Sequence, residues 1–217
     1  RQLETLEQHS PWANWLIILV CCFFYGAIFF GYLPHEHFGD WVLQDFSFPG
    51  LVGHIFLHGG FGHLLGNMIF LWVFGNAVCG NVKNVSYLGF FFAAGILAAC
   101  IHLLVDGSPA IGASGAVNGV VGLVLAMYPI NRVEMLWVFF FRFGTFRAPV
   151  WAMIFVWLAF DIYGVVSGEQ RVAYWAHLGG LMSGFVLGLV GLHFGWLQLT
   201  TYDNRSFYEI LRGEHPE

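Results

Sequence analysis

The segment Ile111-Gly-Ala-Ser-Gly-Ala-Val-Asn-Gly119 decides the fold, because it lines one side of an apolar helix with small residues. At 100° per residue, Gly115, Gly119 and Gly122 form a strip without side chains beside the face that carries Ser114 and Asn118. Such a strip lets two helix backbones approach closely in lipid, where tight packing replaces the hydrophobic drive between helices. The segment therefore predicts a tightly packed helix pair inside a membrane.

The matching strip lies in the last apolar stretch of the chain. There His177 is followed by Gly180, Gly184 and Gly188, which fall within about 80° of it on one helical face. If the two glycine faces meet, Ser114 and His177 lie at the same end of the packed pair. An imidazole then comes within reach of the hydroxyl.

The composition also indicates a membrane protein. Of 217 residues, 58% are hydrophobic and 10% charged, whereas a soluble domain has about 25% charged residues. The 24 Phe and 9 Trp argue against disorder, and 8 Lys and Arg against 13 Asp and Glu leave no basic stripe for nucleic acid. The cysteines lie in apolar runs and are interpreted as small buried hydrophobic residues: Cys21, Cys22, Cys79 and Cys100.

Six stretches have the apolar character of membrane-spanning helices, which need about 20 residues each. The sequence thus predicts an all-α, polytopic bundle of six transmembrane helices in residues 12–196, with a short cytoplasmic segment at 1–11 and a cytoplasmic tail at 197–217. Val133 to Phe143 is apolar and aromatic, but Arg142 and Arg147 punctuate this region, so we interpret it as a half-buried interfacial piece rather than a seventh span. The predicted spans are Trp12 to Leu33, Phe61 to Gly80, Val85 to Val105, Ser114 to Tyr128, Ala148 to Val166 and Val172 to Trp196.

Basic residues predict the orientation, because Lys and Arg are retained on the cytoplasmic side. The first span follows Glu4 and Glu7 rather than a basic region and is too long for a signal peptide, so we expect it to be retained. If both termini lie on the cytoplasmic side of the cell membrane, Arg171 is the one basic residue of the outer loops. The cytoplasmic set is Arg1, Lys83, Arg132, Arg142, Arg147, Arg205 and Arg212.

Polar side chains inside membrane spans are costly and mark candidate sites. A serine hydroxyl becomes a nucleophile when a base accepts its proton, which makes Ser114 and His177 a candidate catalytic pair. Gly112, the free amides that begin the fourth span, and the donors of His63 and Asn67 on one helical face could bind a developing oxyanion. The other polar candidates are His58, His102, Asn118 and Asp161.

The alternatives concern carboxylates and metals. Asp106 is the one acidic residue near Ser114 or His177 in the sequence, so a pair without an orienting carboxylate is the simpler interpretation. Asp161 is interpreted as structural. His54 and His58 lack the glutamate of the zinc protease motif, and a histidine-ligated haem would need facing histidine pairs.

Three motifs together resemble the rhomboid intramembrane serine proteases, over roughly residues 12 to 196. They are His58-Gly-Gly-Phe-Gly-His63-Leu-Leu-Gly-Asn67-Met68, Gly112-Ala-Ser114-Gly115, and Ala176-His177-Leu-Gly-Gly180 with the glycines that follow. The resemblance implies that Ser114 is the nucleophile and His177 its base. It also implies an oxyanion hole of His63, Asn67 and the Ser114 amide, with His58 at the edge of the cavity.

The chain departs from the family pattern in two places. The first outer loop has Phe48-Pro49-Gly50-Leu51 where many members carry a Trp-Arg pair, so that loop is expected to fold differently. Asn118 stands where members often place a tyrosine that stacks on the catalytic histidine, and a hydrogen bond from Asn118 would be the substitute.

We therefore expect a cofactor-free endopeptidase that cleaves membrane-protein substrates in or near their transmembrane segments. Its active site is expected to open to the outer face, with the fifth span as a lateral gate. The alternative is a non-catalytic member that binds client transmembrane helices.

Overall fold

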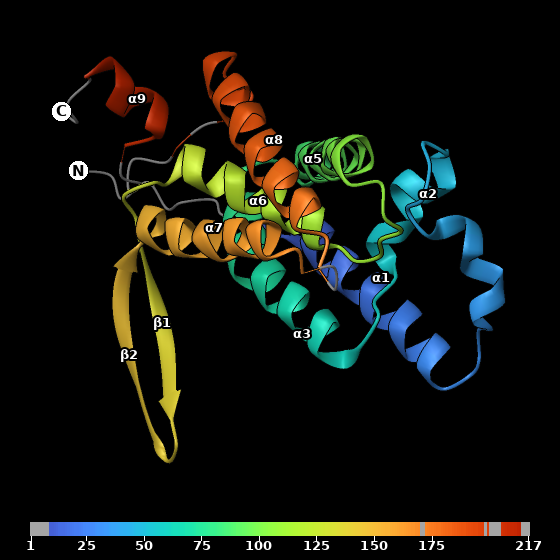
Figure 1. The fold of residues 1–217 in the computed structure, drawn as a ribbon. Coiled ribbons are helices and arrows are strands. Elements are labelled where there is room, and N and C mark those ends of the chain that lie inside the picture. Colours follow the sequence, from blue (N-terminus) through green and yellow to red (C-terminus); the bar gives the residue numbers. More distant parts are fainter. Residues whose placement is uncertain (1–8, 170–171, 198, 200–204, 214–217) are drawn as a thin grey trace.

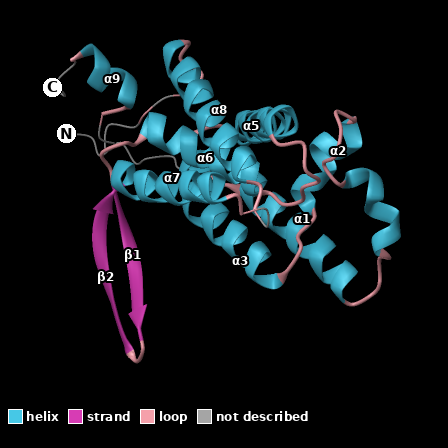
Figure 2. Ribbon diagram, viewed as in Figure 1, coloured by secondary structure: helices cyan, strands magenta, loops and turns pink. Residues whose placement is uncertain are grey.

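The computed structural model describes residues 9–169, 172–197, 199 and 205–213, and in this part it is a helical bundle with one two-stranded hairpin (Figures 1 and 2). Five of its helical segments are long and apolar enough to cross a membrane, and a sixth is shorter. The predicted polytopic helical bundle is thus confirmed. The segments are α1 (Trp12–Phe29), α3 to α4 (Phe61–Asn81), α5 (Asn84–Val105), α6 (Ser114–Met127), α7 (Val150–Ser167) and α8 (Tyr174–His193).

The glycine strips of α6 and α8 meet as expected. A Cβ atom on Gly180 would run into the Gly115 carbonyl, and one on Gly184 would run into the Gly119 carbonyl. A Cβ atom on Gly122 would likewise meet the backbone of α8. The backbones of the two helices are therefore closer than any side chain would allow.

The second span is not a uniform α-helix. It consists of α3 (Phe61–Phe70), a π-helical turn η3 (Leu71–Gly75) and α4 (Asn76–Asn81). The side chain of Asn14 in α1, which is fully buried, donates to the Leu71 carbonyl at 2.8 Å and to Asn76 Oδ1 at 2.9 Å, and its own oxygen accepts from the Tyr87 hydroxyl at 2.7 Å. This buried polar network joins three spans and is fully hydrogen-bonded, as an apolar environment requires.

The loop between α1 and α3 contains three short helices, namely η1 (His35–Trp41), α2 (Phe48–Gly53) and η2 (His54–Phe56). The ring of Trp41 covers Gly53, where a Cβ atom would lie 2.6 Å from the ring. Leu43 and Ala110 form a β-bridge with N···O distances of 3.0 and 2.9 Å. The loop is thereby tied to the segment that precedes Ser114.

The segment Val133 to Phe143, expected as a half-buried interfacial piece with no conformation assigned, lies in regular secondary structure. The chain forms a β-hairpin of β1 (Arg132–Phe139) and β2 (Arg142–Pro149), paired antiparallel from Arg132 with Pro149 to Phe139 with Arg142. Figure 2 shows the hairpin projecting from the bundle at the junction of α6 and α7. Its two strands satisfy their backbone groups by pairing with each other, which an isolated extended segment could not do.

Span ends differ from the prediction by a few residues. Helix α1 ends at Phe29 rather than Leu33, because the chain turns at Gly31, whose φ is +76°. A short helix α9 (Phe207–Arg212) follows the bundle, with Ser206 and Glu209 forming a capping box. Residues 1–8, Arg171 and much of the predicted tail lie outside the described residues, so the domain limits stay predictions.

Candidate active site

One cavity of about 740 Å³ brings the predicted site residues together. Its wall comes from the first turns of α3, α6 and α8, from the middle of α7, and from the segment 108–111. The polar side chains on this wall are those of His63, Asn67, Ser108, Ser114, Asn118, Asp161 and His177.

Ser114 begins helix α6 directly after a constrained turn. Gly112 has a φ of +126°, and the ring of His63 lies where its Cβ atom would be, with 2.5 Å to Cε1. Only glycine fits both conditions. The Gly112 amide donates to the His54 carbonyl at 2.8 Å. That amide therefore fixes the turn and is engaged in the fold, which leaves the Ser114 amide as the helix-start donor nearest the hydroxyl.

His177 pairs with a carboxylate, contrary to the simpler interpretation of the sequence. Its Nδ1 lies 3.0 Å from Asp161 Oδ1, and the two side chains are 16% and 18% exposed. A carboxylate only accepts, so Nδ1 carries the proton and Nε2 is left to act as an acceptor. Asp161 was interpreted as a structural or solubilising residue because it was expected near the hydrated end of the fifth span. The packing of α7 on α8 instead brings it to His177, 16 residues away in the chain.

The residues around His177 differ from the family pattern. Asn118 donates from Nδ2 to the Ser114 carbonyl at 3.0 Å, so this donor is occupied within its own helix. Tyr174, one turn before His177, meets the imidazole edge to face with ring centres 6.2 Å apart. The Tyr174 ring also fills the space beside Gly164 of α7. Tyr174 is a site residue that the sequence analysis missed.

The hydrogen bonds within the described part of the chain include none between the Ser114 hydroxyl and the His177 ring. Both side chains line the same cavity. Catalytic hydrogen bonds are often long in the absence of substrate, so a contact made when substrate binds is compatible with this arrangement.

Asn67 supplies an unused donor. The residue is 7% exposed, it lines the cavity, and its Nδ2 has no hydrogen-bond partner among the described residues. A buried amide without a partner costs about 1–3 kcal/mol, which a ligand oxygen would recover. His63, four residues earlier on α3, faces the same cavity.

His54 and His58, in the loop before α3, are largely buried and uncharged. Burial, with a smaller contribution from the neighbouring His63, lowers the pKa of His58 to about 4. The His58 ring lies 5.2 Å from that of His63, centre to centre. Burial also lowers the pKa of His54 to about 4, while its Nδ1 donates to the Gly50 carbonyl at 2.8 Å. Both rings thus support the loop against α3 as uncharged groups.

Metal ligation finds no support here. Among residues 9–169, 172–197, 199 and 205–213, no group of three His, Cys, Asp or Glu side chains is placed to hold a metal ion. The four cysteines are free thiols.

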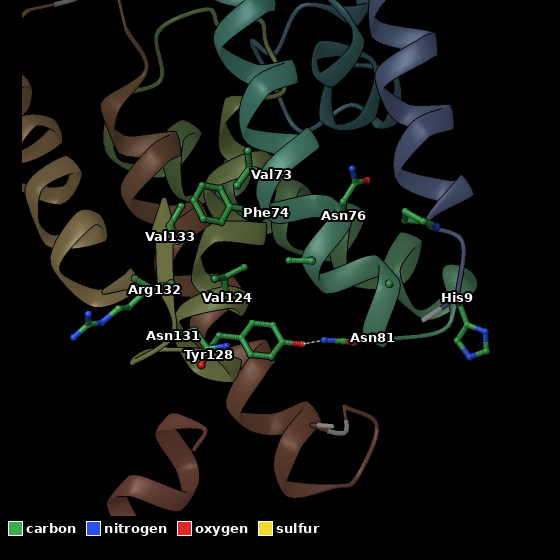
Figure 3. A pocket seen from close by; sticks show the side chains of 14 residues that line it. His9, Val73, Phe74, Asn76, Asn81, Val124, Tyr128, Asn131, Arg132 and Val133 are labelled. Atoms are coloured by element: carbon green, nitrogen blue, oxygen red, sulfur yellow. Dashed lines mark hydrogen bonds between the residues drawn. The ribbon is translucent and has the colours of Figure 1, made fainter. Parts of the chain in front are cut away.

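A second cavity, of about 500 Å³, lies at the opposite end of the bundle, where α4 and α6 end (Figure 3). Its lining includes Asn81, whose Nδ2 donates to the Tyr128 hydroxyl, and no serine. The candidate catalytic groups are therefore gathered at one end of the bundle.

Comparisons with known proteins identify a family. The model of the Rhomboid family, described as a rhomboid domain, matches residues 45–194. The chain is 28% identical over 156 residues to Rhomboid protein 1, mitochondrial, of Saccharomyces cerevisiae, covering 69% of this chain and 42% of that protein. It is 31% identical over 135 residues to Rhomboid protease GluP of Bacillus subtilis, covering 62% and 24%.

A third relative is RHOMBOID-like protein 4 of Arabidopsis thaliana, 34% identical over 148 residues, with 65% of this chain and 34% of that protein covered. The chain spans less than half the length of each of these relatives. The family match covers more than half of the chain and contains all of the motifs described above. This multi-pass membrane protein therefore belongs to the rhomboid family.

Proposed function

We propose that the chain is an intramembrane serine endopeptidase that hydrolyses peptide bonds in or near the transmembrane segments of other membrane proteins. The observation that carries the proposal is the single cavity lined by Ser114, His177, His63 and Asn67. One relative is named a rhomboid protease, which supports the same activity.

In the proposed reaction the Ser114 oxygen attacks the peptide carbonyl carbon while His177 Nε2 takes the hydroxyl proton. His177 then gives this proton to the leaving amine, and the acyl-enzyme remains. Water attacks the ester, again with His177 as base, and releases the acid and the serine. Asp161 acts as a positioning residue, because its carboxylate keeps the proton on His177 Nδ1 and stabilises the imidazolium that forms.

The tetrahedral intermediate needs donors for its oxyanion. The Asn67 amide is the strongest candidate because it is buried and without a partner among the described residues. The His63 ring and the Ser114 amide at the start of α6 complete the proposed set. His58 and Asn118 position these groups: the His58 ring packs against the His63 ring, and Asn118 donates a hydrogen bond to the Ser114 carbonyl.

Hydrolysis requires water within the membrane. Helix α6 has only 14 residues, fewer than a full span needs, and the segment 108–111 before it lines the cavity beside Ser114. Irregular backbone at such depth is tolerated where it borders a water-filled cavity. We propose that the cavity opens to the outer side of the cell membrane, with both termini cytoplasmic. No metal or organic cofactor enters the reaction.

Substrate would enter laterally between α3 and α7. The Phe70 and Trp157 rings close this side with their centres 4.1 Å apart, and both line the cavity. Separation of the two rings would admit an extended segment of a substrate helix to Ser114.

Replacement of Ser114 by Ala tests the nucleophile. Cleavage of a model transmembrane substrate should fall to background while the thermal unfolding of the protein in detergent is unchanged. Ser108→Ala is a matched control, because Ser108 also lines the cavity but its hydrogen bonds go to His102 and Asp106 rather than to the candidate catalytic residues. Retained cleavage in Ser114→Ala, or loss of cleavage on adding a chelator, would contradict the proposal.

The second candidate is a non-catalytic member that binds client transmembrane helices. It is favoured by the missing hydrogen bond between Ser114 and His177 in the described part of the chain. A fluorophosphonate probe separates the two, because it labels an activated serine and leaves an unactivated one intact. Labelling that requires both Ser114 and His177 supports the enzyme.

A further inference from the structure

The β1–β2 hairpin begins and ends at the membrane surface. Only residues 128–131 separate the end of α6 from β1, and α7 follows β2 without a break. Hydrogen bonds from the Val150 amide to the Asn131 carbonyl, at 2.8 Å, and from the Trp151 amide to the Pro129 carbonyl, at 3.0 Å, fix this base. The two flanking helices are membrane helices, so the base lies where they leave the hydrocarbon.

The free end of the hairpin is aromatic and basic. Phe141 is fully exposed and Phe143 is 77% exposed, and the exposed Arg142 lies between them. Closer to the base, Arg147 faces Glu134 at 3.9 Å, and Met135 packs against the core. Large exposed phenyl groups are unfavourable in water, whereas aromatic rings beside arginines are typical of the membrane interface.

The direction of the hairpin agrees with that location. In the view of Figure 1 it leaves the bundle crosswise to α7 rather than as a continuation of it. Two paired strands of eight residues reach about 27 Å. A hairpin of that length, running crosswise to a membrane helix from its end, stays near the membrane plane. A two-stranded ribbon alone in water is marginally stable, so support from a surface is also expected.

We infer that the β1–β2 hairpin is a membrane-interface anchor, whose tip inserts Phe141 and Phe143 among anionic lipid headgroups while Arg142 pairs with them. The positions of the basic residues favour anionic lipid as the partner of the hairpin tip. The hairpin lies on the membrane face that carries Lys83, Arg132 and Arg147, which is the cytoplasmic face in the proposed orientation. The cytoplasmic leaflet is negatively charged and attracts basic segments next to the membrane.

The anchor is tested without any substrate, in the Ser114→Ala background, so its failure and that of the proposed protease activity are distinguishable. In lipid nanodiscs containing phosphatidylglycerol, trypsin should cut slowly after Arg142, because the tip is covered. The double variant Phe141→Ser with Phe143→Ser should be cut about tenfold faster. The matched control Thr145→Ser, on the same face as Phe143 but with one polar side chain exchanged for another, should leave the rate unchanged.

Spin labelling gives a second measurement that does not depend on proteolysis. A nitroxide at Phe141→Cys, with the four native cysteines replaced, should collide more often with oxygen than with a water-soluble nickel complex. A label at Gly144→Cys, on the opposite face of the strand from Phe143, should show the reverse. The inference is overturned if both labels are equally open to nickel, if the double serine variant is cut at the parental rate, or if protection appears only when a membrane-protein substrate is added.

Discussion

Replacing Asp161 by Asn removes one negative charge from the site and keeps the shape of the side chain. In the structure the carboxylate accepts a hydrogen bond from His177 Nδ1 at 3.0 Å. An amide can instead present its NH₂ group to Nδ1, which moves the ring proton to Nε2. In that tautomer His177 cannot accept the proton of Ser114, so the variant should be impaired in the chemical step.

The magnitude follows from the geometry. Two unit charges at this separation interact by about 5 kcal/mol at an effective dielectric constant of about 20. The two side chains are 16% and 18% exposed, so water screens part of this interaction. If about 3 kcal/mol is retained in the transition state, kcat of Asp161→Asn should fall about 100-fold. KM should change little, because Asp161 acts through His177.

The assay measures kcat and KM separately with a fluorogenic transmembrane substrate in detergent. Fluorophosphonate labelling of Ser114 should slow in parallel, which a purely structural role would not require. Asp161→Glu keeps the charge and should recover part of kcat. Tyr163→Phe is the matched control, because Tyr163 lies on the same helix, two residues away, and is 71% exposed.

The reasoning is refuted if Asp161→Asn folds normally and keeps kcat within about threefold of the parent, since the serine and histidine would then work without the carboxylate. A loss of thermal stability that accounts for the lost activity, with unchanged labelling of the folded fraction, would make Asp161 a structural residue.

The remaining predictions concern packing, pH and substrate entry. Gly184→Ala should lower the free energy of unfolding by about 3 kcal/mol, because the new Cβ atom meets backbone of α6 that cannot move aside. Gly89→Ala, with open space around it, should be neutral or slightly stabilising. Thermal unfolding in detergent measures both effects. His54 has a pKa of about 4 in the folded protein, below its usual 6.5, so the unfolded chain takes up a proton first as the pH falls. The free energy of unfolding should therefore decrease by up to about 3 kcal/mol between about pH 6.5 and pH 4, and less in His54→Gln. An unfolding temperature that does not change over that pH range would contradict the burial argument. Trp157→Ala removes an aromatic contact worth about 1 kcal/mol at the proposed gate, so the cleavage rate of a bulky transmembrane substrate should rise about fivefold. A lower cleavage rate with unchanged fluorophosphonate labelling would argue against entry between α3 and α7.

Much of the site could be predicted from the sequence because its parts lie within single helices. His63 and Asn67 share a face because they are four residues apart, and Ser114 follows a glycine at the start of a short apolar run. The glycines of α6 and α8 fixed which two helices pack, since side-chain-free strips have few other uses in lipid. The partner of His177 was missed because Asp161 lies on another helix and no local pattern joins the two.

The remaining differences share that origin. Asn14 is one polar residue in an apolar span, and the Leu71 carbonyl that it bonds begins a π-helical turn that no sequence pattern predicts. Gly112 looked like a free donor, yet its amide is taken by the His54 carbonyl of a loop far away in the chain. The hairpin was missed because a short apolar run such as Val133 to Phe143 has no period that distinguishes a strand from a helix.

The sequence by itself determined that this chain is a membrane bundle and which helix pair forms its centre, because hydropathy and glycine spacing are properties of segments that each helix carries alone. Only the tertiary structure decided which groups complete the site. The pairing of Asp161 with His177, the engagement of the Gly112 amide and the unused donor of Asn67 depend on distances between separate helices and loops, and those distances are set by how closely the glycine faces let the backbones approach.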